Sequence, residues 1–389
     1  MKLHRLTRFL GLPVALILAV GTAAAGAVAA SGSTCVNWTG VAPVNPTGNG
    51  NDLEAVAVPS PCNAWAVGGY VSNGHFKTLV EHWNGTSWQF EISGNPGGFN
   101  QDSYLTAVAA VPGASPWAAG YYFNGTGYQT LIETPKNGVW TQVPTQDPAG
   151  PSSRNVFLAV AATSASNAWA VGKYGGVPES TLIERWNGSA WRQAPSPDPS
   201  AVQNELHGVA ATSVGNAWAV GQYVNGQGAF QTLILHWNGT AWKRVRSQNP
   251  AGPANTNSLQ AVAGVSASSA WAVGDEFTGG VLQPLIEHWN GTAWKSVHTP
   301  TPSLSVPAEL TGVTAISARD AWAVGYYGNP GSLHTLLEHW NGLAWHRVPG
   351  PSPGTEAVLR GVASSPASIW AVGYYSSGGP IQTLAVHCC

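Results

Sequence analysis

Several chemically active side chains recur in this sequence about once every 50 residues. The recurring acid is Glu81, Glu133, Glu184, Glu287 and Glu338, and the recurring imidazole is His82, His236, His288, His339 and His387. Glu and His can bind zinc or act as general acids and bases. Zinc needs its ligands about 2 Å from a single point, whereas one His per repeat spreads the ligands over separate repeats. We therefore expect structural pairing with neighbouring polar groups, and we assign no metal and no cofactor.

A second series stands five residues after each Trp of a repeated Ala-Trp-Ala-Val-Gly block. Its members are Tyr70, Tyr122, Tyr174, Tyr223, Glu276, Tyr327 and Tyr375. A Tyr ring offers an apolar face and a hydroxyl, which suits the binding of a sugar or a peptide. Near-constant spacing equally suits residues that close the ends of repeated units. Both interpretations stay open.

Only the fifth copy breaks the Tyr series, because it has Asp275-Glu276 instead. Adjacent residues of a strand point to opposite faces, so these two acids do not form a glycosidase pair by themselves. Glu54, Glu205 and Glu309 remain candidate partners for Glu276. The pair is kept as a candidate ligand-binding feature.

A third series follows the leading Leu of a repeated Leu-x-Ala-Val-Ala type of segment. It varies among the copies, and its members are Glu54, Thr106, Ala159, His207, Gln260, Thr311 and Arg360. If these segments surround an axis, the residues form a polar ring at the mouth of a channel or a solvated rim. Both alternatives stay open.

Established catalytic motifs are missing from the sequence. It has no Ser/His/Asp motif, phosphate-binding loop or nucleotide fingerprint. A sialidase-like enzyme would need clustered Arg, but only eight Arg follow residue 30 and five of them fall on predicted outer strands. We therefore assign no catalytic residue, and enzyme function is not favoured.

These side chains must be positioned by a unit that is repeated seven times. The Ala-Trp-Ala-Val-Gly block or a variant has its Trp at Trp65, Trp117, Trp169, Trp218, Trp271, Trp322 and Trp370. A Thr-Leu-Ile-Glu-His-Trp-Asn-Gly segment or a variant follows, and in six units it leads to one more Trp. The seventh such Trp is Trp38, which stands eight residues before Pro46 as Trp242 stands before Pro250. All 19 Trp thereby have a repeat position.

Each unit predicts four short strands, here called a to d. In the first unit they are residues 53–58, 64–68, 78–83 and 88 to about 92. The Asn-Gly pair between c and d, such as Asn84-Gly85, is a strong hairpin signal because both residues accept positive φ. Along strand b, Trp65 and Val67 share one face and the small residues share the other. The bulky face can therefore pack on the small face of the next unit.

Four-stranded sheets repeated and stacked in this way predict an all-β, seven-bladed β-propeller over residues 31–389. The last unit supplies strands a, b and c and then ends, while the missing d strand lies near Trp38. We expect the N-terminal strand to complete the last blade and close the ring.

The four cysteines gather where the chain ends would meet. Aligning residues 383–387 with 232–236 puts Cys388 at the Trp237 position, Cys389 at the Asn238 position and Cys35 at the Gly239 position. We expect Cys35 to be bonded to Cys388 or Cys389, and Cys62 to the other of the two. An adjacent Cys388–Cys389 bond would strain the backbone.

The first thirty residues predict a signal peptide that is removed on secretion. Lys2, Arg5 and Arg8 precede an apolar run, and small residues end at Ala30. Retention as a membrane anchor is the alternative, which Pro13 and the Ala/Gly-rich second half disfavour. Removal leaves 13 basic and 18 acidic groups, so nucleic acid is not an expected partner. After cleavage we expect no membrane association.

The repeat resembles that of seven-bladed kelch-like propellers and, more specifically, is similar to the Trp-rich repeats of secreted bacterial proteins. The resemblance covers nearly all of residues 35–389, although only Gly68-Gly69 of the first unit keeps a Gly-Gly doublet after strand b. Such propellers include lectins, hydrolases, oxidases and protein scaffolds, so the resemblance implies a fold and no single function.

The hypothesis from the sequence is a secreted, monomeric binding module for an extracellular carbohydrate or protein. Its ligand would bind on the face where the loops differ in length and composition, because loops on a rigid scaffold commonly carry binding residues. The alternatives are a glycan-cleaving hydrolase with acids at the channel mouth and a passive scaffold of an envelope or matrix.

Overall fold

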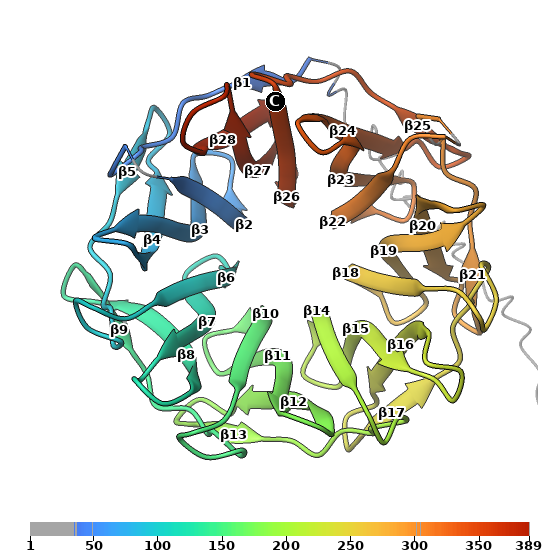
Figure 1. The fold of residues 1–389 in the computed structure, drawn as a ribbon, viewed down its shortest axis with the longest axis horizontal. Helices are drawn as coiled ribbons and strands as arrows, with labels where there is room; N and C mark the ends of the chain where they lie inside the picture. Colours follow the sequence, from blue (N-terminus) through green and yellow to red (C-terminus); the bar gives the residue numbers. More distant parts are fainter. Residues whose placement is uncertain (1–34, 36, 49, 301, 304, 389) are drawn as a thin grey trace, which may run out of the picture. The chain divides into compact units, whose positions relative to one another are not determined.

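The computed structural model describes residues 35, 37–48, 50–300, 302–303 and 305–388. The predicted signal peptide at residues 1–30 and Cys389 lie outside these residues. Within them, strands β1 to β28 form seven four-stranded antiparallel sheets. The sheets are the blades of a ring, with one strand of each blade next to the central axis (Figure 1). The same residues contain no helix long and apolar enough to cross a bilayer.

The blades are numbered 1 to 7, and their strands run from a at the axis to d at the rim. The a strands are β2 (Asn51–Ser60), β6 (Ser103–Ala109), β10 (Asn155–Ser164), β14 (Asn204–Ser213), β18 (Asn257–Ser266), β22 (Ala308–Ser317) and β26 (Glu356–Ser365). The b strands are β3 (Asn63–Ser72), β7 (Trp117–Phe123), β11 (Asn167–Gly175), β15 (Asn216–Val224), β19 (Ser269–Thr278), β23 (Asp320–Asn329) and β27 (Ser368–Ser376). The c strands are β4 (His75–Trp83), β8 (Tyr128–Lys136), β12 (Glu179–Trp186), β16 (Phe230–Trp237), β20 (Val281–Trp289), β24 (Ser332–Trp340) and β28 (Gln382–Cys388). The d strands are β5 (Trp88–Phe90), β9 (Val139–Gln142), β13 (Trp191–Gln193), β17 (Trp242–Val245), β21 (Trp294–Ser296), β25 (Trp345–Arg347) and β1 (Thr39–Gly40).

Tryptophans join each blade to the next. Trp169 and Val171 of blade 3 pack with Ala217 and Ala219 of blade 4, so the predicted bulky-on-small packing is confirmed. Each b-strand Trp also contacts the d-strand Trp of the following blade, with ring centroids 5.0 to 5.4 Å apart. Such edge-to-face pairs contribute beyond the area they bury. The repeated Trp positions are therefore the interfaces that hold the ring together.

The chain ends close the ring in blade 7. Thr39 pairs with His387 and Gly40 with Val386, so β1 is the d strand of the sheet formed by β26, β27 and β28. Trp38 completes the series of interblade contacts by packing on Trp322. A Cys35–Cys388 disulfide joins the two ends. Cys62 is exposed and is bonded to none of the other described cysteines, and the predicted Cys62–Cys389 bond involves a residue outside the described part.

The repeated Glu residues connect neighbouring blades. Glu81 accepts a hydrogen bond from the Val44 N–H at 2.9 Å, and Glu184 accepts one from the Gln146 N–H at 2.8 Å. In each case the donor lies on the segment that leads in from the preceding blade. All five of these Glu are fully buried, and burial raises the pKa of Glu81, Glu133 and Glu338 to about 8. These Glu residues therefore have a structural role, as the sequence predicts.

The repeated His residues are used within their own blades. His82, His236, His288, His339 and His387 each stack near the b-strand Trp at ring distances of 4.0 to 4.3 Å. Their Nε2 atoms contact the first residue of strand b, as His236 contacts Asn216 at 2.7 Å. These contacts account for the recurrence of an imidazole at this position.

The c-to-d connections are hairpins, as predicted, but the Asn of the Asn-Gly pair does not adopt positive φ. Gly85 has φ of 97°, but the preceding Asn84 is not among the described non-Gly residues with positive φ. Its Oδ1 instead accepts the N–H groups of Thr86 and Ser87 at 3.0 and 3.1 Å. The Asn therefore acts through its side chain, as in an Asx turn, and only the Gly needs the left-handed conformation.

Candidate functional site

A β-bulge in every a strand turns one side chain toward the axis. In blade 4 the register shifts between Leu206 and Gly208, which leaves His207 unpaired with strand b. The b-strand Gly of the repeated block makes this possible, because a Cβ on Gly221 would lie 2.1 Å from the carbonyl oxygen of Glu205. All seven b strands have Gly at this position, with equally close contacts. The constant Gly of the repeat therefore produces the bulge, and the bulge residue is the one that differs among the blades.

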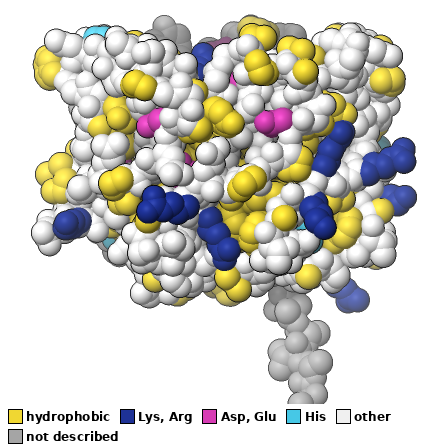
Figure 2. All heavy atoms as spheres, turned by 90° about the horizontal axis from the view of Figure 1, so that it is seen from below, with side chains coloured by type: hydrophobic (Ala, Val, Ile, Leu, Met, Phe, Trp, Pro, Cys, Tyr) yellow, Lys and Arg dark blue, Asp and Glu magenta, His cyan; other side chains and the backbone are white. Residues whose placement is uncertain are grey.

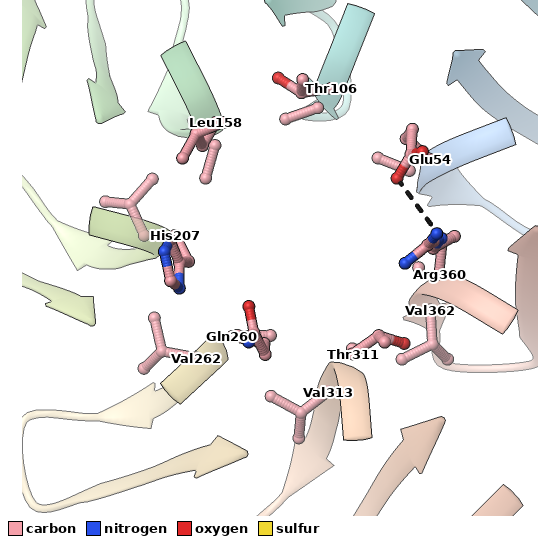
Figure 3. Close-up of a pocket in the computed structure, with 18 of the residues that line it drawn as sticks. Glu54, Thr106, Leu158, His207, Gln260, Val262, Thr311, Val313, Arg360 and Val362 are labelled. Carbon is pink, nitrogen blue, oxygen red and sulfur yellow. Dashed lines mark ion pairs between the residues drawn. The ribbon is translucent and has the colours of Figure 1, made fainter. Parts of the chain in front are cut away.

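The seven bulge residues form the predicted ring around a cavity of about 340 Å³ (Figure 3). They are Glu54, Thr106, Leu158, His207, Gln260, Thr311 and Arg360. One prediction was wrong: blade 3 contributes Leu158 and not Ala159, because its register shift lies between Phe157 and Ala159. Phe157 takes the buried place of the leading Leu there. The ring thus has six polar members and one apolar member.

Beneath the polar ring the wall of the cavity is apolar. The residue two positions after each bulge is Val, and all seven line the cavity: Val56, Val108, Val160, Val209, Val262, Val313 and Val362. An apolar wall does not stabilise a charge. Ionic chemistry is therefore confined to the polar ring and to the mouth at which the a strands begin.

A second tier of residues lies at this mouth, and the sequence analysis named only Glu205, Asp275 and Glu309 among them. The tier consists of the residue before each leading Leu and the residue after each b-strand Gly, and these residues pair with one another across the two strands. Its charged or phenolic members are Asp52, Tyr104, Tyr121, Lys173, Glu205, Asp275, Glu309, Tyr326 and Tyr374. The available signal was that both positions vary among repeats as strongly as the bulge position does.

On one side of the mouth, a tyrosine bridges two acids of blade 1. The Tyr104 hydroxyl donates to Asp52 at 2.6 Å and lies 2.9 Å from Glu54 Oε1. Its ring covers Gly69, where a Cβ would lie 2.3 Å from the ring, so the Gly-Gly doublet of blade 1 makes room for Tyr104. Arg360 Nε approaches Glu54 at 3.9 Å (Figure 3). Burial raises the pKa of Asp52 to about 6 despite the Tyr104 hydrogen bond.

On the opposite side, Glu205 is held by two basic groups. Lys173 Nζ lies 3.1 Å from Glu205, and His207 Nε2 lies 3.1 Å from it. Burial by itself would raise the pKa of Glu205, but the hydrogen bond and charge of His207 and the charge of Lys173 outweigh it and lower the pKa to about 2. Glu205 is therefore ionised and has its charge compensated within the protein.

Between these two groups, blades 5 and 6 bring two further acids together. Asp275 is buried, and burial together with the charge of Glu309 raises its pKa to about 7 although Gln260 lies 3.3 Å away. Glu309 accepts a hydrogen bond from the Tyr326 hydroxyl at 2.5 Å. Near neutral pH the Asp275 carboxyl is therefore partly protonated, and it lies beside the Glu309 side chain that Tyr326 binds.

The structure separates the predicted Tyr series from the axial cavity. Its members pack against the interblade cores: Tyr70, Tyr122, Tyr174, Tyr223, Tyr327 and Tyr375. Tyr174 and Tyr223 line outer pockets of their own blades, and Tyr375 donates to Gln382. Glu276 also lines an outer pocket, whereas Asp275 faces Gln260 at the mouth. The two adjacent acids thus point apart, and Glu309 neighbours Asp275 and not Glu276.

The mouth offers ionic and hydrogen-bonding groups without a metal-binding arrangement. The described residues contain no group of three or more His, Cys, Asp or Glu side chains that could hold a metal ion. Its carboxyl groups outnumber its Lys and Arg side chains, since Asp52, Glu54, Glu205, Asp275 and Glu309 share the mouth with Lys173 and Arg360. Such an arrangement can take up a cationic group.

Comparisons with known proteins identify the fold alone. No protein family and no curated protein sequence matches the chain. By structure, it resembles YCF48 bound to D1 peptide, with a TM-score of 0.54 and 14% identity over 90% of this chain and 96% of that one. It also resembles the WD40 β-propeller domain of Doa1, with a TM-score of 0.55 and 10% identity over the same shares. A Trypanosoma rangeli sialidase in complex with the inhibitor DANA gives a TM-score of 0.46 and 12% identity over 87% of this chain and 55% of that one.

Proposed function

We propose that the protein is an exported, monomeric binding module in which residues 31–389 form one propeller domain and residues 1–30 serve as a signal peptide. The ligand binds at the mouth of the axial cavity. The Cys35–Cys388 disulfide supports export, because such bonds persist in oxidising compartments. The observation that carries the binding proposal is that the non-repeating charged and phenolic groups converge on this one mouth, while the repeated Glu, His and Trp are used in packing.

The ligand is a polypeptide that presents a Lys or Arg side chain. Glu205 is already paired with His207 and with Lys173, which also binds Glu179, so Asp52, Glu54, Asp275 and Glu309 are left to share Arg360. A bound cation would relieve this excess and would lower the raised pKa of Asp275. A fold neighbour solved with a peptide, YCF48, is in line with a polypeptide ligand on such a scaffold.

The test is selection from a random peptide-display library against the folded protein, with an array of neutral and acidic glycans probed in parallel. We expect enrichment of peptides with Lys or Arg, and at least tenfold weaker binding, about 1.4 kcal/mol, in an Asp52→Asn/Glu309→Gln variant. Glu91→Gln is the matched control, because Glu91 lies after an outer strand beside His82. A blank selection would contradict the proposal, and glycan binding alone would replace the peptide with a carbohydrate.

A second candidate function is cleavage of a glycan at the same mouth. The observation in its favour is the Asp275–Glu309 pair, since glycoside hydrolysis uses two carboxyl groups and a raised pKa, as at Asp275, suits the one that acts as general acid. Incubation with a panel of aryl glycosides tests it. Turnover that an Asp275→Asn variant loses would support hydrolysis, and no turnover by the folded protein across pH 5 to 8 would exclude it for those substrates.

A further inference from the structure

The rim of blade 4 carries a pocket that differs from its counterpart in blade 3. The blade 4 pocket is about 620 Å³ and is lined by Tyr223, Arg244, Arg246, Gln248 and Asn249, among others. The blade 3 pocket is about 300 Å³ and is lined by Tyr174, Gln193, Pro195 and Asp198. Trp191 and Trp242 begin the respective d strands, so Gln193, Pro195 and Asp198 correspond to Arg244, Arg246 and Asn249.

Three differences between these pockets change the charge in the same direction. Asp198 gives the blade 3 lining a formal charge of −1, whereas Arg244 and Arg246 give the blade 4 lining +2. The change from Asp to Asn keeps the local fold, because Asp198 accepts the Thr181 N–H at 2.9 Å and Asn249 accepts the Thr232 N–H at 2.9 Å. Blade 4 therefore retains the structural bond and removes the negative charge.

Arg244 is held in place, and both guanidinium groups are open to solvent. The guanidinium of Arg244 donates to the Tyr223 hydroxyl at 2.7 Å and lies 4.5 Å from the centre of its ring. Arg246 is exposed at the end of the same segment. Among the described residues, neither Arg has a carboxylate within ion-pair distance. Glu287 approaches the pocket only from its buried side, where it accepts hydrogen bonds from Ser247 and Gln248.

The surrounding wall is also basic. Figure 2 shows the side of the ring formed by the blades at the bottom of Figure 1, where Lys and Arg side chains clearly outnumber Asp and Glu. The d strands β13 and β17 contribute Arg192, Lys243 and Arg244 to this part of the molecule. This field would concentrate anions near the pocket.

We propose that the blade 4 pocket binds a tetrahedral oxyanion, a phosphate or a sulfate, with Arg244 and Arg246 as its ligands. The planar fork of a guanidinium matches two oxygens of such a group, and the ordering of Arg244 by Tyr223 reduces the entropy lost on binding. The Asn249 amide supplies a further N–H donor, because its Oδ1 is already taken by Thr232. The oxyanion is either free or carried as an ester on a saccharide.

The test is calorimetric titration of the whole protein with inorganic phosphate, inorganic sulfate, and a sulfated disaccharide beside its unsulfated form. We expect one site and at least tenfold weaker binding in Arg244→Gln/Arg246→Gln. Arg192→Gln/Lys243→Gln is the matched control, since it removes the same charge on the same wall and should change affinity about twofold. Tighter binding of the sulfated disaccharide than of sulfate would assign the ester as the source, and equal binding would assign the free ion.

Transfer of the pocket gives an independent check. The blade 3 variant Gln193→Arg/Pro195→Arg/Asp198→Asn should raise the stoichiometry from one site to two. No binding of any probe, or equal weakening in both double variants, would overturn the proposal. The blade 4 variants should leave peptide binding at the axial mouth unchanged, so the failure of one site is distinguishable from the failure of the other.

Discussion

The interblade tryptophans and the channel mouth follow opposite rules within one ring. Every b-strand Trp contacts a d-strand Trp of the next blade, and the seven contacts are nearly identical. At the mouth, seven equivalent bulges carry side chains as different as those of His207, Leu158 and Arg360. Positions that must stack on a copy of themselves are held constant, whereas positions that face only the axis are free to differ. The constant Trp positions thus provide stability, and the variable mouth positions are available for recognition.

The largest effect should come from breaking one interblade contact. Trp218 is fully buried and packs on Trp294 and Trp289 at 5.1 and 4.9 Å, so Trp218→Ala should cost about 4 kcal/mol. Glu309→Gln at the mouth should change stability by less than about 0.5 kcal/mol. Chemical denaturation of both variants measures this contrast, and equal losses would abolish the distinction between the two regions.

Opening the ring should have the next largest effect. Cys35 and Cys388 are 353 residues apart in the sequence, so their bond restricts almost the whole unfolded chain. Cys35→Ser should lower the stability by about 3 kcal/mol. Cys62→Ser, at an exposed position, is the comparison and should have little effect. A Cys35→Ser protein that melts at the wild-type temperature would show that the chain ends do not limit stability.

Adding a methyl group at the bulge should have a smaller effect on stability, and it should also disturb the channel mouth. Gly221→Ala places a Cβ 2.1 Å from the Glu205 carbonyl oxygen, which forces the backbone apart at a cost of about 2 kcal/mol. Because His207 is the bulge residue and Glu205 lies two residues before it, the variant should also weaken peptide binding. Gly226→Ala, which meets nothing within 4 Å, is the control in thermal melts. Unchanged stability would mean that the bulge is not imposed by this glycine.

The smallest expected effect is a dependence of stability on pH that arises from the repeated Glu residues. Burial raises the pKa of Glu81, Glu133 and Glu338 to about 8, so the native state keeps protons that the unfolded chain releases above its pKa of 4.5. Stability therefore falls as pH rises from 4.5 to 8 and levels off above pH 8, and the part of this loss that remains between pH 8 and 9 is about 1 kcal/mol for the three carboxyls together. Burial lowers the pKa values of four repeated His, which are therefore largely neutral in both states over this interval: His82, His236, His288 and His387.

Replacing those three Glu by Gln should flatten the profile. Thermal unfolding at pH 7, 8 and 9 provides the measurement. A wild-type melting temperature that rises with pH would contradict the assignment of these carboxyls as buried and protonated.

The sequence predicted the parts of the molecule that repeat. Trp spacing indicated seven blades, and the position of Trp38 indicated which strand closes the ring. The a, b and c strands extend beyond the predicted cores, while β5 ends at Phe90 and not near Ile92. Repetition made these predictions possible because every blade packs on its neighbours through the same residue types at the same spacing.

The candidate site was only partly predictable, because a bulge changes which residues face the axis. Alignment on the leading Leu identified His207 and Arg360 but assigned Ala159 in blade 3, since Phe157 there replaces Leu and Leu158 follows it. The pairing of Asp275 with Glu309 depends on how blades 5 and 6 meet, and no spacing within one repeat encodes it. Side-chain contacts between blades had to come from the structure.

The most direct test of the account is the affinity of one selected basic peptide for the wild type and for Asp52→Asn/Glu309→Gln, measured with the melting temperature of each. We predict at least tenfold weaker binding with a melting temperature that changes by no more than about 2 °C. Unchanged binding, or binding lost only together with folding, would contradict the claim that the non-repeating mouth recognises the ligand.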